Sequence, residues 1–280
     1  MNPNGSITLA QAVLLAILQG VTELFPVSSL GHAVVVPHLI GWNLDQQAPA
    51  YLPFLVMLHL GTALALLAYF WPDWWALLSS LASREPTPLV RQNRYLLWLL
   101  VVGTVPAGIL GLLLEKRLAL LFGRYQMVGL FLVLNGLLLL GAEWLRRQER
   151  FGELSKLRPR QALLIGLSQA IALLPGFSRS GAAMAGGLLV GLTHQSAARF
   201  GFLLSTPIIL AAAVLEVPKL FAPALRPELA PALAGGVTAG VVAYLSTAIL
   251  MRYFRSHEVN ALLPFAFYCV VLGGAALVMG

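Results

Sequence analysis

Long apolar stretches alternate along the chain with short segments that carry most of the Lys, Arg, Asp and Glu residues. A helix needs about 20 mainly apolar residues to cross a bilayer, and backbone exposed to lipid must satisfy its own hydrogen bonds. Six stretches have this length or come close to it. We therefore predict six transmembrane helices, at Tyr51–Trp71, Tyr95–Leu114, Tyr125–Ala142, Phe200–Leu215, Pro231–Met251 and Ala261–Met279.

Two further apolar regions, residues 9–42 and 161–193, are each interrupted by a cluster of Pro, Ser and Gly. The arm that follows each interruption has about 10 residues, which is too short to cross a bilayer. Non-helical backbone survives at membrane depth only where protein or a polar cavity surrounds it. We therefore predict two re-entrant helical hairpins, broken at Phe25-Pro26-Val27-Ser28-Ser29-Leu30-Gly31-His32 and at Leu174-Pro175-Gly176-Phe177-Ser178-Arg179-Ser180-Gly181.

The Lys and Arg residues gather on one side of these predicted spans. Loops rich in Lys and Arg stay in the cytoplasm, so the distribution predicts that both termini lie outside. The first hairpin then enters from the outside and the second from the cytoplasm. The cytoplasmic side carries eleven such residues, Arg84, Arg91, Arg94, Arg146, Arg147, Arg150, Lys156, Arg158, Arg160, Arg252 and Arg255, and the other side carries five, Lys116, Arg117, Arg124, Lys219 and Arg226.

The two halves of the chain resemble each other. A shift of 150 positions aligns Gln19 with Gln169, Ser28 with Ser178 and Gly31 with Gly181, although chance matches between apolar stretches are the alternative. Each half holds one hairpin and three spans, and because three is odd the second half must lie inverted. The predicted fold is an all-α polytopic membrane protein with an inverted-topology repeat. It forms a single integral-membrane domain, residues 1–280, with repeat one at about 1–150 and repeat two at about 151–280.

Composition supports this class of protein. The chain is 59% hydrophobic and only 10% charged, whereas soluble domains are about 25% charged. This excludes an ordinary cytosolic enzyme, a disordered chain and a nucleic-acid reader, so we expect membrane lipid and no nucleic acid as partners. The single Cys269 excludes an intramolecular disulfide. A signal peptide starts with basic residues, but the first one here is Arg84, so we expect the stretch from Leu9 to belong to the mature fold.

Glu23 is the only charged residue among the first 44. An ionisable group inside a membrane segment is costly and therefore indicates function, although a structural carboxylate paired inside the bundle is the alternative. Gln19 lies one helical turn earlier on the same face and can offer an amide oxygen. Oxygen ligands of this kind, completed by phosphate, suit Mg²⁺ or Ca²⁺. We therefore predict a divalent cation at Gln19 and Glu23.

Arg179 is the corresponding charge in the second hairpin, flanked by Ser178 and Ser180. Serine at a helix start caps free N–H groups, and the helix N-terminus attracts anions. A guanidinium adds bidentate phosphate binding. The sequence thus predicts a phosphate site, and the alternative is a structural pair between Arg179 and Glu23 without a ligand. Under either hypothesis the two hairpins should meet.

Ser28, Ser29 and His32 lie at the first break. Ser29 is a candidate nucleophile with His32 as acid or base, Ser28 a candidate phosphate ligand. The alternatives are a helix cap for Ser28, a hydrogen-bonding role for Ser29 and a buried structural role for His32. The other histidines are assigned structural or interfacial roles: His38, His59, His194 and His257.

The two broken motifs, about 150 residues apart, resemble the bacterial undecaprenyl-pyrophosphate phosphatase family of the bacitracin-resistance (BacA) type. The resemblance extends along nearly the whole chain, including Gly103-Thr104-Val105-Pro106 and Phe202-Leu203-Leu204-Ser205-Thr206-Pro207. It implies a metal-dependent enzyme of the bacterial inner membrane. This enzyme removes one phosphate from undecaprenyl pyrophosphate at the outer face and so recycles the lipid carrier for peptidoglycan synthesis.

The resemblance also implies roles for individual residues. It implies that Glu23, Ser29, His32 and Arg179 are catalytic, that Ser178, Arg179 and Ser180 bind phosphate, and that Gln19 and Glu23 are metal ligands. Ser28, the phosphate-ligand candidate at the first break, completes the expected site. This chain departs from the family pattern in three places. Gln19 is the less acidic option at its position, Leu30 replaces a small hydroxyl residue, and Ala183 replaces a threonine.

The main alternative function is a polyprenyl-phosphate transporter or flippase, because inverted repeats with broken helices also suit alternating access. The set of Glu23, Ser29 and His32 favours hydrolysis, since simple transport needs no nucleophile. Whether Ser29 or a metal-bound water attacks phosphorus stays open, as does the oligomeric state, for which a homodimer is one candidate.

Overall fold

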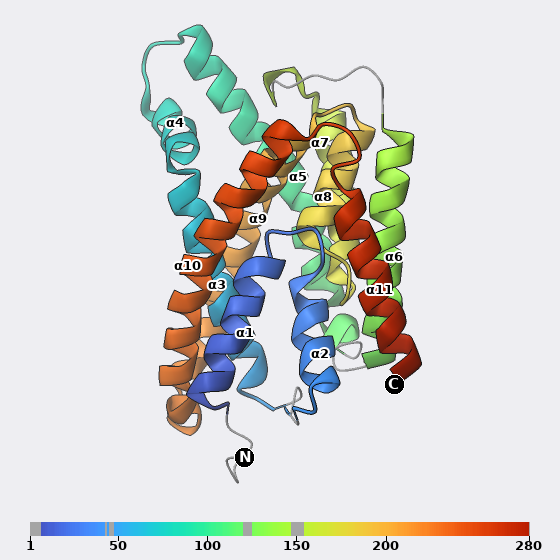
Figure 1. Cartoon of the computed structure of the whole chain (residues 1–280). Coiled ribbons are helices and arrows are strands. Elements are labelled where there is room, and N and C mark those ends of the chain that lie inside the picture. The colour runs from blue at the N-terminus through green and yellow to red at the C-terminus, as the bar shows by residue number, and fades with distance from the viewer. Residues whose placement is uncertain (1–6, 43, 45–47, 120–124, 147–153, 280) are drawn as a thin grey trace.

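The computed structural model describes residues 7–42, 44, 48–119, 125–146 and 154–279, which form a bundle of α-helices (Figure 1). The predicted all-α polytopic fold is confirmed. The α-helices are α1 (Leu9–Thr22), α2 (Ser29–Leu39), α3 (Tyr51–Tyr69), α4 (Trp71–Ala82), α5 (Pro88–Ala119), α6 (Tyr125–Leu145), α7 (Pro159–Ala170), α8 (Arg179–Leu189), α9 (His194–Glu216), α10 (Arg226–Ser256) and α11 (Leu263–Met279). Short 3-10 helices are η1 (Leu154–Lys156), η2 (Ile171–Leu173), η3 (Val217–Phe221) and η4 (Pro223–Leu225).

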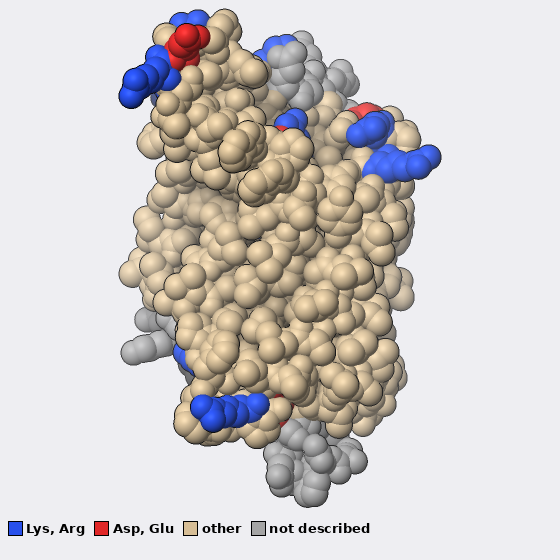
Figure 2. Space-filling view, turned by 90° about the vertical axis from the view of Figure 1, so that its left-hand side faces the viewer, with Lys and Arg blue, Asp and Glu red and all other residues tan. Residues whose placement is uncertain are grey.

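Five helical segments in the described part are long and apolar enough to cross a membrane. They are Tyr51–Tyr69, Pro88–Leu114, Tyr125–Leu145, His194–Phe221 and Pro223–Ser256. The sixth predicted span is the 17-residue apolar helix α11. The face shown in Figure 2 carries its charged side chains near its two ends, with a broad uncharged band between them. These features are those of a multi-pass membrane protein.

The two predicted hairpins are present, and they start from opposite ends of the bundle. Hairpin one (α1 and α2) rises from the end where both chain termini lie, and hairpin two (α7, η2 and α8) descends from the other end (Figure 1). This is the arrangement expected of an inverted repeat. The proposed boundary between the repeats, near residue 150, lies outside the described residues, as do Arg124, Arg147 and Arg150.

A serine N-cap starts the second helix of each hairpin. Ser28 Oγ accepts a 3.1 Å hydrogen bond from Gly31 N, and Ser178 Oγ accepts one of the same length from Gly181 N. Both serines are therefore N-caps, which satisfy a free N–H group at a helix start. Ser28 reaches this position with φ of 70°, a conformation that is costly for a residue with a side chain. The aligned Ser and Gly positions of the repeat thus have the same structural role.

Small residues let the hairpins and spans pack closely. Nine of the eleven residues of α8 are buried, and most of them are Ala or Gly, so neighbours can approach this helix from all sides. At Gly61 of α3, an added Cβ would lie 1.9 Å from the carbonyl oxygen of Gly236 in α10. At Gly166 of α7, an added Cβ would lie 2.1 Å from the carbonyl oxygen of Gly103 in α5. These helix pairs therefore meet backbone to backbone.

A buried polar cluster closes the end of the bundle opposite the termini. His194 Nε2 lies 2.8 Å from Glu143 Oε1, and its Nδ1 lies 3.3 Å from Glu258 Oε2. Arg146 pairs with Glu143 at 3.3 Å, and Leu262 N donates to Glu143 Oε1 at 2.7 Å. The cluster ties α6 and α9 to the turn between α10 and α11, which gives His194 a structural role.

The contact at Gly61 generates the first prediction. We expect Gly61→Ala to lower the thermal stability of the detergent-purified protein, because overpacking a filled site costs about 1–3 kcal/mol. The control is Gly108→Ala in α5, where a Cβ would meet nothing within 4 Å. Thermal unfolding of both variants measures the difference, and equal melting temperatures would contradict the close packing of α3 on α10.

Candidate active site

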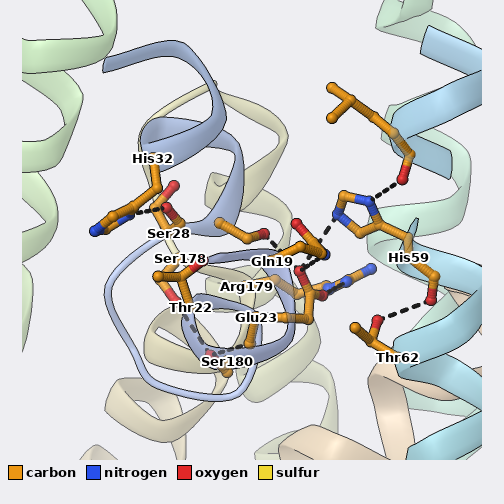
Figure 3. Close-up of polar contacts among 12 residues, drawn as sticks. Gln19, Thr22, Glu23, Ser28, His32, His59, Thr62, Ser178, Arg179 and Ser180 are labelled. Atoms are coloured by element: carbon orange, nitrogen blue, oxygen red, sulfur yellow. Dashed lines mark hydrogen bonds and ion pairs between the residues drawn. The ribbon is translucent and has the colours of Figure 1, made fainter. Parts of the chain in front are cut away.

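The site is built around an ion pair between the two hairpins. Glu23, which follows the last residue of α1, pairs through Oε1 with Nη2 of Arg179, the first residue of α8 (Figure 3). The Glu23 side chain is only 7% exposed and that of Arg179 21%. Charges this deep in a membrane protein need a partner. The predicted meeting of the hairpins is confirmed by this contact.

The second carboxylate oxygen of Glu23, Oε2, contacts three further side chains. Ser29 Oγ donates a 2.5 Å hydrogen bond to Glu23 Oε2, and Gln19 Nε2 donates one of 3.0 Å. His59 Nε2 lies 3.3 Å from the same oxygen. A hydroxyl this close to a buried carboxylate has a proton acceptor in place, as a nucleophile requires.

Of the two serines beside Arg179, Ser180 bonds to the opposite hairpin. Its Oγ lies 3.3 Å from Glu23 O and 3.4 Å from Phe25 O, at the start of the first break. It also lies 3.1 Å from Ser178 Oγ. The hydroxyls predicted to bind phosphate therefore line the seam between the hairpins, next to the ion pair.

Asn135 joins the two breaks with one side chain. It is fully buried in α6, donates from Nδ2 to Pro26 O at 3.1 Å, and accepts at Oδ1 from Ser178 N at 3.0 Å. The first bond holds the turn of hairpin one and the second holds the start of α8. The sequence analysis missed this residue, and the available signal was an amide within an otherwise apolar span.

His32 lies apart from the ion pair. Its Nδ1 is 2.7 Å from Ser28 O, which can only accept, so Nδ1 carries a proton. Its Nε2 is 2.7 Å from the hydroxyl of Tyr268 in α11. The side chain is fully buried, and in the described part of the chain no hydrogen bond joins it to Glu23 or Arg179. The hydrogen-bond partners of His32 are thus Ser28 and Tyr268, and its role as acid or base stays a prediction.

His59 is the histidine that contacts the Glu23 carboxylate. Assigning it a structural or interfacial role was incomplete, because α3 packs beside hairpin one and brings its imidazole to Glu23 (Figure 3). An available signal was that His59 is an ionisable residue in the middle of a predicted transmembrane span. Neither hairpin motif contains it.

The residues present supply part of a cation site. The described residues include no group of three or more His, Cys, Asp or Glu that could hold a metal ion. They do place Glu23 Oε2 3.0 Å from Nε2 of the Gln19 amide. A 180° rotation of that amide group would bring its oxygen, in place of its nitrogen, to this position. These donors fit a cation whose remaining ligands come from phosphate oxygens.

Comparison with known proteins agrees with the resemblance of the motifs. The family model described as "Bacitracin resistance protein BacA" matches residues 12–275. An undecaprenyl-diphosphatase of Acidiphilium cryptum is 53% identical over 273 residues, which cover 96% of each chain. One of Granulibacter bethesdensis is 52% identical over 286 residues, 97% of each chain, and one of Gluconacetobacter diazotrophicus is 50% identical over 275 residues, 97% of this chain and 96% of the relative.

Asn135 provides a test of the coupling between the breaks. We expect Asn135→Leu, which is similar in size, to lower the thermal stability of the purified protein. It leaves Ser178 N without its acceptor and Pro26 O with only the Cys269 Sγ contact at 3.9 Å, and an unsatisfied buried group costs about 1–3 kcal/mol. Thr104→Val is the control, because its hydroxyl bonds to Leu100 O one turn earlier in the same helix. If both variants melted at the same temperature, Asn135 would not hold the breaks together.

Proposed function

The chain belongs to the family of the bacitracin resistance protein BacA, and we propose that it hydrolyses undecaprenyl diphosphate to undecaprenyl phosphate and phosphate at the site around Glu23 and Arg179. The product is the lipid carrier of peptidoglycan synthesis, and bacitracin resistance is the family's namesake property. The observation that carries the assignment of the site is the buried ion pair at the junction of the hairpins, with the Ser29 hydroxyl on the same carboxylate.

Arg179 is the proposed phosphate ligand. Its guanidinium has five N–H groups in a fork that matches phosphate oxygens, and its side chain retains 21% exposure while paired to Glu23. It begins helix α8, whose N-terminus also favours an anion. Ser178 and Ser180 add hydroxyls on the same turn. Together these groups would bind the diphosphate and stabilise the charge on the transferring phosphoryl group.

Ser29 and Glu23 are the proposed reacting pair. The 2.5 Å hydrogen bond supports transfer of the Ser29 proton to Glu23 as the serine oxygen attacks the terminal phosphorus and undecaprenyl phosphate leaves. Water would then hydrolyse the phosphoserine, which releases phosphate and restores the Ser29 hydroxyl. His32 then has a positioning role, because its bond to Ser28 O holds the turn that presents Ser29. A divalent cation held by Glu23 and Gln19 would neutralise negative charge on the phosphate oxygens.

We place the site toward the outer face of the bacterial inner membrane. Hairpin one, which carries Glu23 and Ser29, enters from the end of the bundle where both termini lie (Figure 1). The predicted orientation, based on the distribution of Lys and Arg, puts that end outside.

Phosphate release tests the function. The detergent-purified protein should release phosphate from undecaprenyl diphosphate with Mg²⁺ or Ca²⁺, and a chelator should reduce the rate. Glu23→Gln should lose at least about 10²-fold in kcat, because it removes the proton acceptor and the charge while keeping the volume. Absence of release by the wild-type protein with either ion would favour the transporter function, and an active Glu23→Gln would exclude the proposed base.

Arg179→Lys tests bidentate recognition. Lysine keeps the charge but loses the fork, so we expect most of the contribution of an arginine so placed, about 10³–10⁵ in rate, to disappear. Arg179→Ala should be inactive but still fold, because Glu23 keeps its contacts with Ser29, Gln19 and His59. Turnover of Arg179→Lys near the wild-type rate would show that a positive charge alone is enough.

A further inference from the structure

The imidazole of His59 is held in one orientation by its own helix. Nδ1 lies 2.8 Å from the carbonyl oxygen of Leu55, one turn earlier in α3. A carbonyl can only accept a hydrogen bond, so Nδ1 carries a proton and Nε2 is the nitrogen that faces Glu23. This nitrogen lies 3.3 Å from Glu23 Oε2 (Figure 3).

Nε2 of His59 and Oε2 of Glu23 thus face each other inside the protein, and a cation between them would be bound by both atoms. A histidine that binds a metal ion commonly donates its other ring N–H to a backbone carbonyl, which is the bond made to Leu55. Two neighbouring ligands, each about 2.1–2.3 Å from one ion, lie about 3.0–3.4 Å apart. The observed 3.3 Å falls in this range.

We propose that His59 is a ligand of the divalent cation, together with Glu23 and Gln19. This inference rests on the proposed function, which supplies the phosphate oxygens that complete the coordination. An imidazole ligand suits Zn²⁺, Fe²⁺ and Ni²⁺ better than Mg²⁺ or Ca²⁺. His59 therefore biases the site of this chain toward the former ions.

The charges around His59 indicate when the ion binds. Glu23 and Arg179 carry opposite charges and contact each other, so the site attracts a cation weakly by itself. A diphosphate adds several negative charges, and its oxygens replace water in the coordination shell. The ion and the diphosphate should therefore bind together.

The test measures the ion directly. Mn²⁺ is added to the purified protein with methylenediphosphonate, a diphosphate analogue without a hydrolysable bridge, and pulsed electron paramagnetic resonance detects ¹⁴N coupled to the bound Mn²⁺. We expect the imidazole signal in the wild-type protein and its loss in His59→Gln. The variant should bind Mn²⁺ about 10-fold more weakly and discriminate less between Zn²⁺ and Mg²⁺.

His257→Gln is the matched control, because His257 is exposed at the end of α10 and contacts Ser256 and Tyr253. It should keep the imidazole signal and the affinity. No imidazole signal in the wild-type protein, or a signal that survives His59→Gln, would overturn the proposal and leave an imidazolium ion pair with Glu23. Hydrolysis without the imidazole signal would refute His59 as a ligand but leave the proposed function intact. The imidazole signal without hydrolysis would support His59 as a ligand but refute the proposed function.

Discussion

The ion pair between Glu23 and Arg179 is the interaction that fixes where the two hairpins meet. Each charge lies at or beside the break of a hairpin, within a bundle of apolar spans. Burial of either charge without polar partners would carry a large cost. The pair therefore requires that the two hairpins, which are 156 residues apart in sequence at this contact, meet at one point. Ser180 and Asn135 add neutral hydrogen bonds across the same seam.

The inverted repeat explains how such a seam can form inside a membrane. Hairpins that enter from opposite ends bring two helix starts together near the middle of the bundle, and each start is capped by its own serine. The capped breaks keep their backbone groups satisfied, which is the condition for irregular backbone at this depth. The halves then differ in what they carry. At the position after the capping serine, hairpin one has the Ser29 hydroxyl and hairpin two has the Arg179 guanidinium, so the same fold element carries both the proposed nucleophile and the proposed anion ligand.

Local signals predicted the hairpins and the central pair, because a lone charge and a Pro, Ser and Gly interruption stand out in an apolar sequence. The rest of the site depends on how distant helices pack. The direction of His59 is set by Leu55 O and by the position of α3 beside hairpin one, and Asn135 acts only because α6 lies against both breaks. The bond between His32 and Tyr268 joins residues 236 positions apart. The spacing of residues within the motifs does not encode these contacts. The sequence therefore could not show that His59, and not His32, hydrogen-bonds or pairs with Glu23.

The neutrality of the central pair constrains how the site can bind its substrate. In the structure, one guanidinium nitrogen of Arg179 faces Glu23, and the two charges largely cancel. A diphosphate must therefore compete with the carboxylate for Arg179, and the gain comes from the greater charge of the phosphate oxygens. In the proposed mechanism Arg179 would turn toward phosphate, and Glu23 would lose its strongest partner. It would then become a better acceptor for the Ser29 proton and a better ligand for a cation, because a nearby positive charge would no longer stabilise its charged form. If the proposed roles hold, substrate binding would activate the carboxylate that the ion pair otherwise holds.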